Sequence, residues 1–202
     1  MDPRTLAAGP ELDALTALVR SFTAGIASRS GTWLGSGVVW HPDGLVVTNA
    51  HVVRDARPLV TVAGAGTLEG RVVAADRKRD LALVRVDATG LAAAQPGDAG
   101  SLAAGSLVLA LGHPLGVAHA LSLGVVHGVT TRHGTPRFIS ADIRLAPGNS
   151  GGPLVDTRAR VVGVNAMIVG GLGVAIATSV VRAFLRDASL VGAVPFTHPQ
   201  AA

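Results

Sequence analysis

The chain has 202 residues, of which 49% are hydrophobic and 15% charged, and its mean hydropathy is +0.47. This length and composition provide ample apolar material for a core, which excludes a disordered chain and a disulfide-stapled miniprotein. The pI near 11.2 accompanies a net charge of only +4, because no Tyr or Cys titrates at alkaline pH. The basic residues are scattered, with Arg77, Lys78 and Arg79 as their only cluster, so we expect no nucleic-acid partner.

The N-terminus gives the first expectation about location. It passes from Met1 to Glu11 and Asp13 without a continuous apolar run, so we expect no signal peptide and a cytoplasmic protein as given. A periplasmic or secreted location is the alternative if the N-terminus was trimmed. The uncharged residues 161–181 are long enough to span a bilayer, but their glycines and β-branched residues favour two buried strands around Gly170 and Gly171. We therefore expect no membrane partner.

Residues 10–22 predict an amphipathic helix, because apolar residues recur there at helical spacing. Its apolar positions are Leu12, Leu15, Leu18, Val19 and Phe22. Short β-rich runs separated by turn residues follow, which is typical of an antiparallel barrel or sandwich. These runs are residues 36–40, 45–48, 59–62, 70–75 and 81–86.

The second half of the chain repeats this spacing after residues 87–102, which we interpret as a linker. Its predicted strands are residues 107–111, 120–129, 137–140, 153–156, 161–166 and 173–177. Thr178 or Ser179 is expected to cap a closing helix. The predicted units are a helical segment (1–22), a first barrel (23–95), a second barrel with the closing helix (96–188) and a flexible tail (189–202).

The segment from Pro147 to Pro153 carries the clearest chemical signal. Three glycines surround Ser150, and such a loop lets backbone N–H groups converge beside a hydroxyl, as the stabilisation of an oxyanion requires. Ser150 is therefore a candidate nucleophile, and it needs a base elsewhere in the chain. His51 follows an apolar strand and Asp80 opens one, so these two residues are the candidates for a base and for its orienting carboxylate.

Gly148-x-Ser150-x-Gly152 also fits the nucleophile elbow of α/β-hydrolases, followed formally by Asp187 and His198. Pro153 argues against that alternative, because it interrupts the helix that an elbow must enter.

Five strings occur in the order expected of one family. They are Gly35-Ser36-Gly37-Val38-Val39, Thr48-Asn49-Ala50-His51-Val52-Val53, Asp80-Leu81-Ala82-Leu83, Gly112-His113-Pro114-Leu115-Gly116 and Gly148-Asn149-Ser150-Gly151-Gly152-Pro153. Together they resemble the chymotrypsin-like serine proteases, and among these the protease domain of the HtrA/Deg family. The resemblance covers residues 20–187 and implies an all-β fold of two antiparallel six-stranded β-barrels, with one helix at each end.

The resemblance also implies roles for individual residues. Ser150 is the implied nucleophile, His51 the general base and acid, and Asp80 the residue that fixes the imidazole tautomer. Gly148, Asn149 and Ser150 form the implied oxyanion-hole segment, with the N–H groups of Gly148 and Ser150 as donors. The implied substrates are polypeptides. A homotrimer through the N-terminal segment and an activating partner protein are further implied partners, although the helix could instead pack on its own barrel.

No cofactor and no metal are expected. The absence of Cys removes thiolate ligands, and five histidines other than His51 show no metal-ligand spacing. These are His41, His113, His119, His127 and His133. The sequence also departs from the family pattern, since we expect no PDZ domain after the closing helix and His113 stands where Asn is usual.

The resemblance predicts a shallow apolar specificity pocket beside Ser150. Its predicted lining and flanking residues are Arg144, Leu145, Val164, Asn165, Ala166 and Val174. Arg144 decides the preference, because an inward guanidinium would favour acidic substrates and an outward one leaves an aliphatic preference. The same fold could alternatively serve as a latent, partner-activated or chaperone-like binding module, since a triad in a sequence does not guarantee an ordered oxyanion hole.

Overall fold

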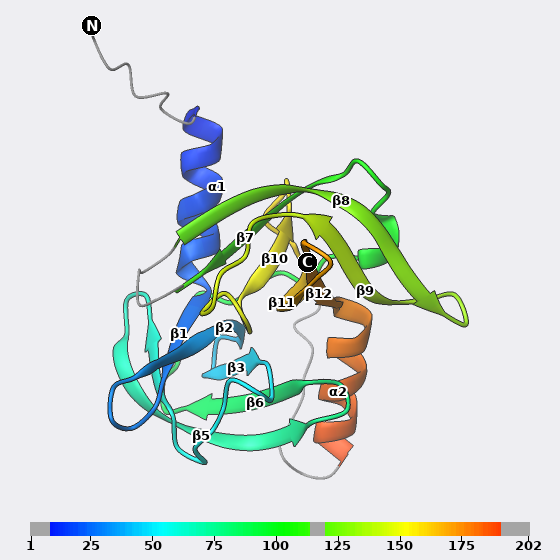
Figure 1. The fold of residues 1–202 in the computed structure, drawn as a ribbon. Coiled ribbons are helices and arrows are strands. Elements are labelled where there is room, and N and C mark those ends of the chain that lie inside the picture. Colours follow the sequence, from blue (N-terminus) through cyan, green and yellow to red (C-terminus); the bar gives the residue numbers. More distant parts are fainter. Residues whose placement is uncertain (1–8, 114–119, 191–202) are drawn as a thin grey trace, which may run out of the picture.

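Two closed antiparallel β-barrels follow one another along the chain, and the computed structural model describes them over residues 9–113 and 120–190 (Figure 1). The first contains β1 (Thr23–Ala27), β2 (Trp33–His41), β3 (Leu45–Thr48), β4 (Leu59–Val62), β5 (Gly66–Asp76) and β6 (Leu81–Val86). The second contains β7 (Leu107–Gly112), β8 (Ala120–Arg132), β9 (Thr135–Asp142), β10 (Pro153–Asp156), β11 (Val161–Val169) and β12 (Leu172–Ala177). This architecture confirms the predicted all-β fold of two six-stranded barrels.

The strand order is β1-β2-β3-β6-β5-β4 in the first barrel and β10-β11-β12-β9-β8-β7 in the second. Each barrel has its own fully buried interior. One apolar cluster fills the first barrel and continues through Leu109, Leu111 and Phe184 into the space between the barrels. A second cluster, which includes Ile139 and Leu154, fills the other barrel. Continuous burial across that junction fixes the two barrels against each other, and with them the loops that carry the motifs.

The segment predicted as a linker crosses between the barrels and bonds to both. Ala94 N–H donates to the Val39 carbonyl of β2, while Val161 N–H of β11 donates to the Gln95 carbonyl. A single turn of 3₁₀-helix, η1 (Ala99–Ser101), follows, with the Asp98 side chain accepting from Gly100 N–H at 2.8 Å. The linker is therefore held between the barrels by backbone hydrogen bonds to both of them.

Helix α1 (Pro10–Ser21) begins with Pro10, whose missing N–H costs nothing at a helix start. Of its side chains, Val19 is fully buried, Leu12 and Leu15 pack partly on the core, and Leu18 remains 53% exposed. The apolar face predicted for this helix is thus only half covered by the described chain.

Helix α2 (Thr178–Leu190) begins at the second barrel, where it contacts β9, β11 and β12, and runs down beside the first barrel (Figure 1). The hydroxyls expected to cap it bond to other elements instead. Thr178 Oγ1 donates to the Gly97 carbonyl at 3.1 Å, and Ser179 Oγ donates to the Pro136 carbonyl of β9. These bonds tie the start of α2 to the linker and to the barrel, because a hydroxyl buried at such a junction needs a partner there.

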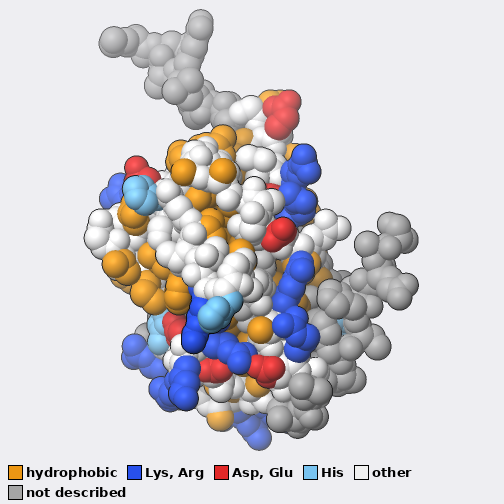
Figure 2. Space-filling model, turned by 90° about the vertical axis from the view of Figure 1, so that its right-hand side faces the viewer, with side chains coloured by type: hydrophobic (Ala, Val, Ile, Leu, Met, Phe, Trp, Pro, Cys, Tyr) orange, Lys and Arg blue, Asp and Glu red, His pale blue; other side chains and the backbone are white. Residues whose placement is uncertain are grey.

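Residues 161–181, considered above as a membrane span, form β11, a turn at Gly170 and Gly171, β12 and the first turn of α2. Across the described ranges, no helix has the length and apolarity needed to cross a bilayer. On the face drawn in Figure 2, Lys and Arg side chains are interspersed with Asp and Glu side chains, so neither sign of charge dominates that face.

Candidate active site

His51 and Asp80 form a two-point contact. The His51 Nδ1 lies 2.8 Å from Asp80 Oδ2, and the His51 backbone N–H donates to Asp80 Oδ1 at 3.0 Å. His51 lies three residues after the end of β3 and Asp80 directly precedes β6. These two strands pair in register, which brings both residues to the same barrel edge. A carboxylate in this position favours the tautomer that carries the proton on Nδ1, and in that tautomer Nε2 is an acceptor.

The backbone at Asp80 adopts an unusual conformation, with a φ of +53° that residues with a side chain rarely take. Asn49 stabilises it, because the fully buried amide donates from Nδ2 to the Asp80 carbonyl at 2.9 Å. The preceding turn is fixed by Asp76, whose Oδ1 accepts from the N–H groups of Lys78 and Arg79. Sequence reasoning quoted Asn49 only as part of a motif and assigned it no role. The sequence feature that could have indicated a role was the amide side chain of Asn49, two residues before the candidate base His51.

Arg79 connects this turn to helix α2. Its Nη2 donates to Asp187 Oδ2 of α2 at 2.6 Å, and its Nε lies 3.2 Å from Asp76 Oδ2. The closing helix therefore contacts the residue next to Asp80. Such a bond across the barrels limits the freedom of the turn that positions the carboxylate.

Ser150 lies in a loop of tight glycine turns. Gly148 has a φ of +105° and Gly151 a φ of +85°, both in the region that favours glycine. A methyl group at Gly151 would also collide with the Ser36 carbonyl and the Thr48 hydroxyl, so the loop packs directly on β2 and β3 of the first barrel. Among the described residues, the backbone N–H groups of Gly148 and Ser150 donate to no acceptor.

The Ser150 loop reaches the neighbourhood of His51 through Gly35. A methyl group on Gly35 would lie 2.8 Å from the Ser150 carbonyl and 2.8 Å from Val52 Cγ2, and Val52 is the residue after His51. The loop of Ser150 and the residue that follows His51 therefore both lie against one glycine of β2.

The Ser150 hydroxyl does not bond to His51 in this structure. Its Oγ donates to the Ala166 carbonyl of β11 at 3.2 Å, which turns it toward the neighbouring hollow. Rotation about the Cα–Cβ bond changes the direction of this hydroxyl, and such rotations take picoseconds to nanoseconds.

A hollow of about 300 Å³ adjoins Ser150 and is mostly apolar in its lining. It is lined by Leu145, Ala146, Pro147, Asn149, Ser150, Asn165, Ala166, Met167 and Ile168. Three of the predicted lining residues, Leu145, Asn165 and Ala166, are in this set.

Three predicted residues, Arg144, Val164 and Val174, lie outside this lining, and four residues that were not predicted belong to it: Ala146, Pro147, Met167 and Ile168. Val164 is fully buried in the core cluster between the barrels, because side chains alternate along β11, and Val174 is buried outside the lining. Met167 and Ile168 are added because a bulge between Asn165 and Met167 shifts the register of β11 against β12. The bulge turns the strand end toward the hollow.

Arg144 is exposed and is not part of the lining. Its neighbours Ile143 and Leu145 are buried and half-buried, so the exposed side chain of Arg144 lies on the outer face of this segment. The outward orientation, which leaves the hollow without a cation, is the one seen.

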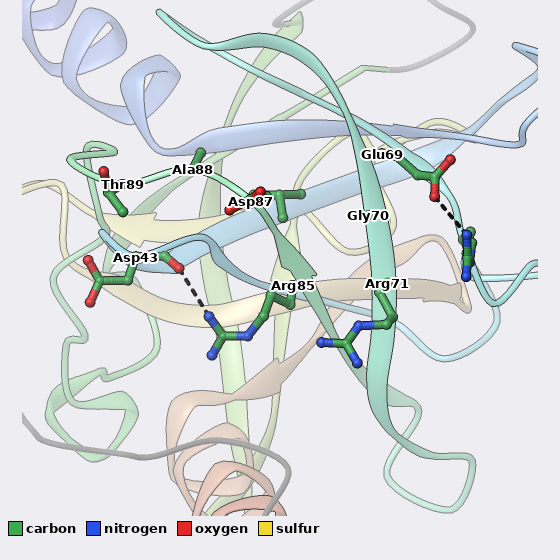
Figure 3. A pocket seen from close by; sticks show the side chains of 10 residues that line it. Asp43, Glu69, Gly70, Arg71, Arg85, Asp87, Ala88 and Thr89 are labelled. Carbon is green, nitrogen blue, oxygen red and sulfur yellow. Dashed lines mark hydrogen bonds and ion pairs between the residues drawn. The ribbon is translucent and has the colours of Figure 1, made fainter.

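A larger hollow, of about 500 Å³, lies on the outer surface of the first barrel (Figure 3). Ser150 is not among the residues that line it. Arg57 Nη1 pairs there with Glu69 Oε1 at 3.3 Å, and Arg85 Nη1 donates to the Asp43 carbonyl at 3.3 Å. None of its lining residues belongs to the motifs that carry the chemistry. The smaller hollow beside Ser150 is therefore the one relevant to catalysis. Within the described ranges, no group of His, Asp and Glu side chains could hold a metal ion.

Comparison with known proteins assigns the chain to a family. The profile of the trypsin-like peptidase domain matches residues 35–164, which contain His51, Asp80 and Ser150. The chain belongs to the trypsin-like peptidase family. This peptidase is 36% identical over 182 residues to a DegP-like periplasmic serine endoprotease of Pseudomonas putida, covering 82% of the chain. It is 39% identical over 153 residues, or 70% of the chain, to the serine protease HhoB of Synechocystis.

Solved structures agree with the fold. The HtrA-type protease AlgW with decapeptide superimposes with a TM-score of 0.79 at 23% identity, covering 88% of this chain and 67% of that chain. The serine endoprotease of Yersinia pestis superimposes with a TM-score of 0.78 at 26% identity, covering 89% and 67%. The predicted resemblance to HtrA/Deg proteases is confirmed.

This peptidase spans 38% of the length of its Pseudomonas putida relative and 37% of HhoB. The expectation of a cytoplasmic location is wrong, because the Pseudomonas relatives are periplasmic endoproteases. That expectation rested only on the first residues of the sequence, which do not determine the compartment.

Proposed function

We propose that this chain is a serine endopeptidase of the periplasm in which His51, Asp80 and Ser150 are the catalytic residues. The observation that carries the proposal is the double contact between His51 and Asp80, at 2.8 and 3.0 Å, beside the glycine-rich loop of Ser150. A carboxylate that holds Nδ1–H leaves Nε2 as an acceptor for a serine proton, which is the arrangement that activates a hydroxyl.

The reaction begins when the Ser150 hydroxyl turns from the Ala166 carbonyl toward His51. Its oxygen attacks the peptide carbonyl carbon while His51 Nε2 takes the proton, and Asp80 stabilises the imidazolium. The unengaged N–H groups of Gly148 and Ser150 are available to the oxyanion. His51 then gives the proton to the departing amine. A water molecule attacks the acyl carbonyl while His51 takes one of its protons, and the tetrahedral intermediate releases the carboxylic acid as His51 returns the proton to the Ser150 oxygen.

The hollow beside Ser150 supports a preference for aliphatic side chains before the scissile bond. Ala146, Pro147, Ala166 and Ile168 present apolar surface to it, and Arg144 stays outside. A charged substrate side chain would find no partner there and would lose its hydration.

Labelling with an active-site fluorophosphonate tests the proposed function. The Ser150 oxygen attacks phosphorus and fluoride leaves, so the wild-type chain should be labelled stoichiometrically and Ser150→Ala should not be labelled. Ser106→Ala, which removes a partly buried hydroxyl that accepts from Ala103 N–H, is the control and should be labelled like wild type. Equal labelling of Ser150→Ala and wild type would refute the assignment.

A further inference from the structure

Ser36 of β2 is fully buried, and four hydrogen bonds join it to the Ser150 loop and to neighbouring segments. Its hydroxyl donates to the Gly148 carbonyl at 2.7 Å and accepts from His113 N–H at 2.9 Å. Its backbone N–H donates to the Ser150 carbonyl at 2.8 Å, and its carbonyl accepts from Thr48 Oγ1 at 2.6 Å. One residue of the first barrel thereby holds the chain on both sides of Asn149.

The peptide unit between Gly148 and Asn149 stands between the two N–H groups proposed for the oxyanion hole. Its carbonyl bonds to Ser36 Oγ, and its N–H donates to the Ala146 carbonyl at 3.0 Å. A peptide unit is planar, so fixing both of its ends fixes the torsions on either side of it. Those torsions set how the Gly148 N–H and the Ser150 N–H are directed relative to each other.

The hydrogen bonds from Ser36 matter because the peptide follows a glycine. Gly148 adopts a φ of +105° and has no side chain to restrict its backbone, so the residue itself does not keep the peptide in one orientation. Ser36 itself is fully buried, so loss of its hydroxyl removes a protein donor that the Gly148 carbonyl has in this fold.

We propose that Ser36 is a positioning residue that fixes the orientation of the Gly148–Asn149 peptide and so keeps the oxyanion hole formed. This inference rests on the proposed function for its effect on catalysis, but its structural part does not. Through Thr48, which ends β3 three residues before His51, the same residue also connects the nucleophile loop to the segment that carries the base.

The kinetic test compares Ser36→Ala with wild type on a peptide substrate. Removing an oxyanion donor itself costs roughly 10²–10³-fold in kcat, so loss of a residue that only orients the donors should lower kcat by about 10- to 100-fold. KM should change less than about threefold, because ground-state contacts in the hollow remain. Affinity for a peptide boronate, whose boron bonds to the Ser150 oxygen to form a tetrahedral adduct, should fall in parallel with kcat.

Thr178→Ala is the matched control, because it also removes a fully packed hydroxyl that donates to a backbone carbonyl, away from the Ser150 loop. It should leave kcat and boronate affinity within about twofold of wild type. If Ser36→Ala does not fold, Ser36→Cys replaces it. The weaker S–H donor should give a smaller loss in kcat at unchanged KM. A kcat for either Ser36 variant equal to that of Thr178→Ala would overturn the proposal.

Crystal structures of wild type and of the Ser36 variant test the structural part separately. The Gly148–Asn149 peptide should rotate away from its wild-type orientation in the variant, and an unchanged orientation would overturn the proposal whatever the activity. A wild-type chain that a fluorophosphonate fails to label would refute the proposed function alone, since the peptide orientation would still decide the role of Ser36.

Discussion

Asp80 combines a strained backbone with a chemical role. Its φ of +53° places the carboxylate where one oxygen meets the His51 ring and the other meets the His51 N–H. Residues held in such sparsely populated regions cost on the order of 1–3 kcal/mol each and persist only where their surroundings hold them. Here the surroundings are Asn49, the turn at Asp76 and the bond from Arg79 to Asp187.

Asp80→Asn should keep the fold and lower kcat/KM by about 10⁴-fold, as the same change does in the trypsin-like triad, because an amide no longer enforces the Nδ1–H tautomer. Circular dichroism and cleavage of a peptide substrate measure the two effects. Asp98→Asn makes the same chemical change at a carboxylate that only accepts from Gly100 N–H, and it should retain near wild-type activity. Comparable activity in Asp80→Asn and wild type would contradict the role given to Asp80.

Asn49→Ala should reduce activity without touching a reacting group. It removes the donor to the Asp80 carbonyl, which should destabilise the fold by about 1–3 kcal/mol. The resulting displacement of the carboxylate should lower kcat by about 10- to 100-fold. Thr23→Ala removes another buried side-chain donor to a carbonyl, that of Val19, and serves as the control for stability. Equal kcat values in the two variants, measured below their unfolding temperatures, would show that Asn49 is only structural.

At the scale of elements, the hollow beside Ser150 depends on how β11 ends. The bulge after Asn165 brings Met167 and Ile168 to its edge, while Arg144 in the β9–β10 connection stays outside. We expect the specificity of the site to depend on this bulge and not on a single charged residue.

Matched peptides with Val or Glu before the scissile bond test this account of specificity. We expect wild type to prefer Val by about 10- to 200-fold in kcat/KM, because the hollow offers no partner for a carboxylate. Arg144→Ala should leave that ratio within about twofold. A preference for Glu in wild type that disappears in Arg144→Ala would mean that the guanidinium turns inward in solution.

The strands could be predicted where apolar runs are bounded by turn residues, and β3, β4, β6 and β10 have the predicted limits. β1 was missed because Gly25 and its two alanines give a weak strand signal. The bulge in β11 was also missed, because a bulge depends on register with a partner strand. The motifs located His51, Asp80 and Ser150. The contact between Ser36 and Gly148 joins residues 112 positions apart and needed the fold.

For the whole molecule, α1 presents a candidate surface for assembly. Leu18 is 53% exposed and Leu12 and Leu15 are only partly buried, while Val19 of the same helix is fully buried. A second copy of the chain could cover this face, in line with the trimer that the family resemblance implies.

Light scattering tests assembly through α1. We expect a mass of three chains for the full chain and of one chain after removal of residues 1–20. Leu18→Glu should also yield single chains, and its exposed position should leave unfolding unchanged. A trimer that survives both changes, or a full chain that is monomeric, would contradict assembly through this helix.

The central claim is that the chain cleaves peptide bonds through Ser150. A peptide-library cleavage profile of the purified protein, with Ser150→Ala prepared in parallel, tests activity and specificity together. The account predicts cleavage by wild type after Val, Ala, Leu or Ile, and none by Ser150→Ala. Identical profiles for wild type and Ser150→Ala, or no cleavage by wild type, would contradict it.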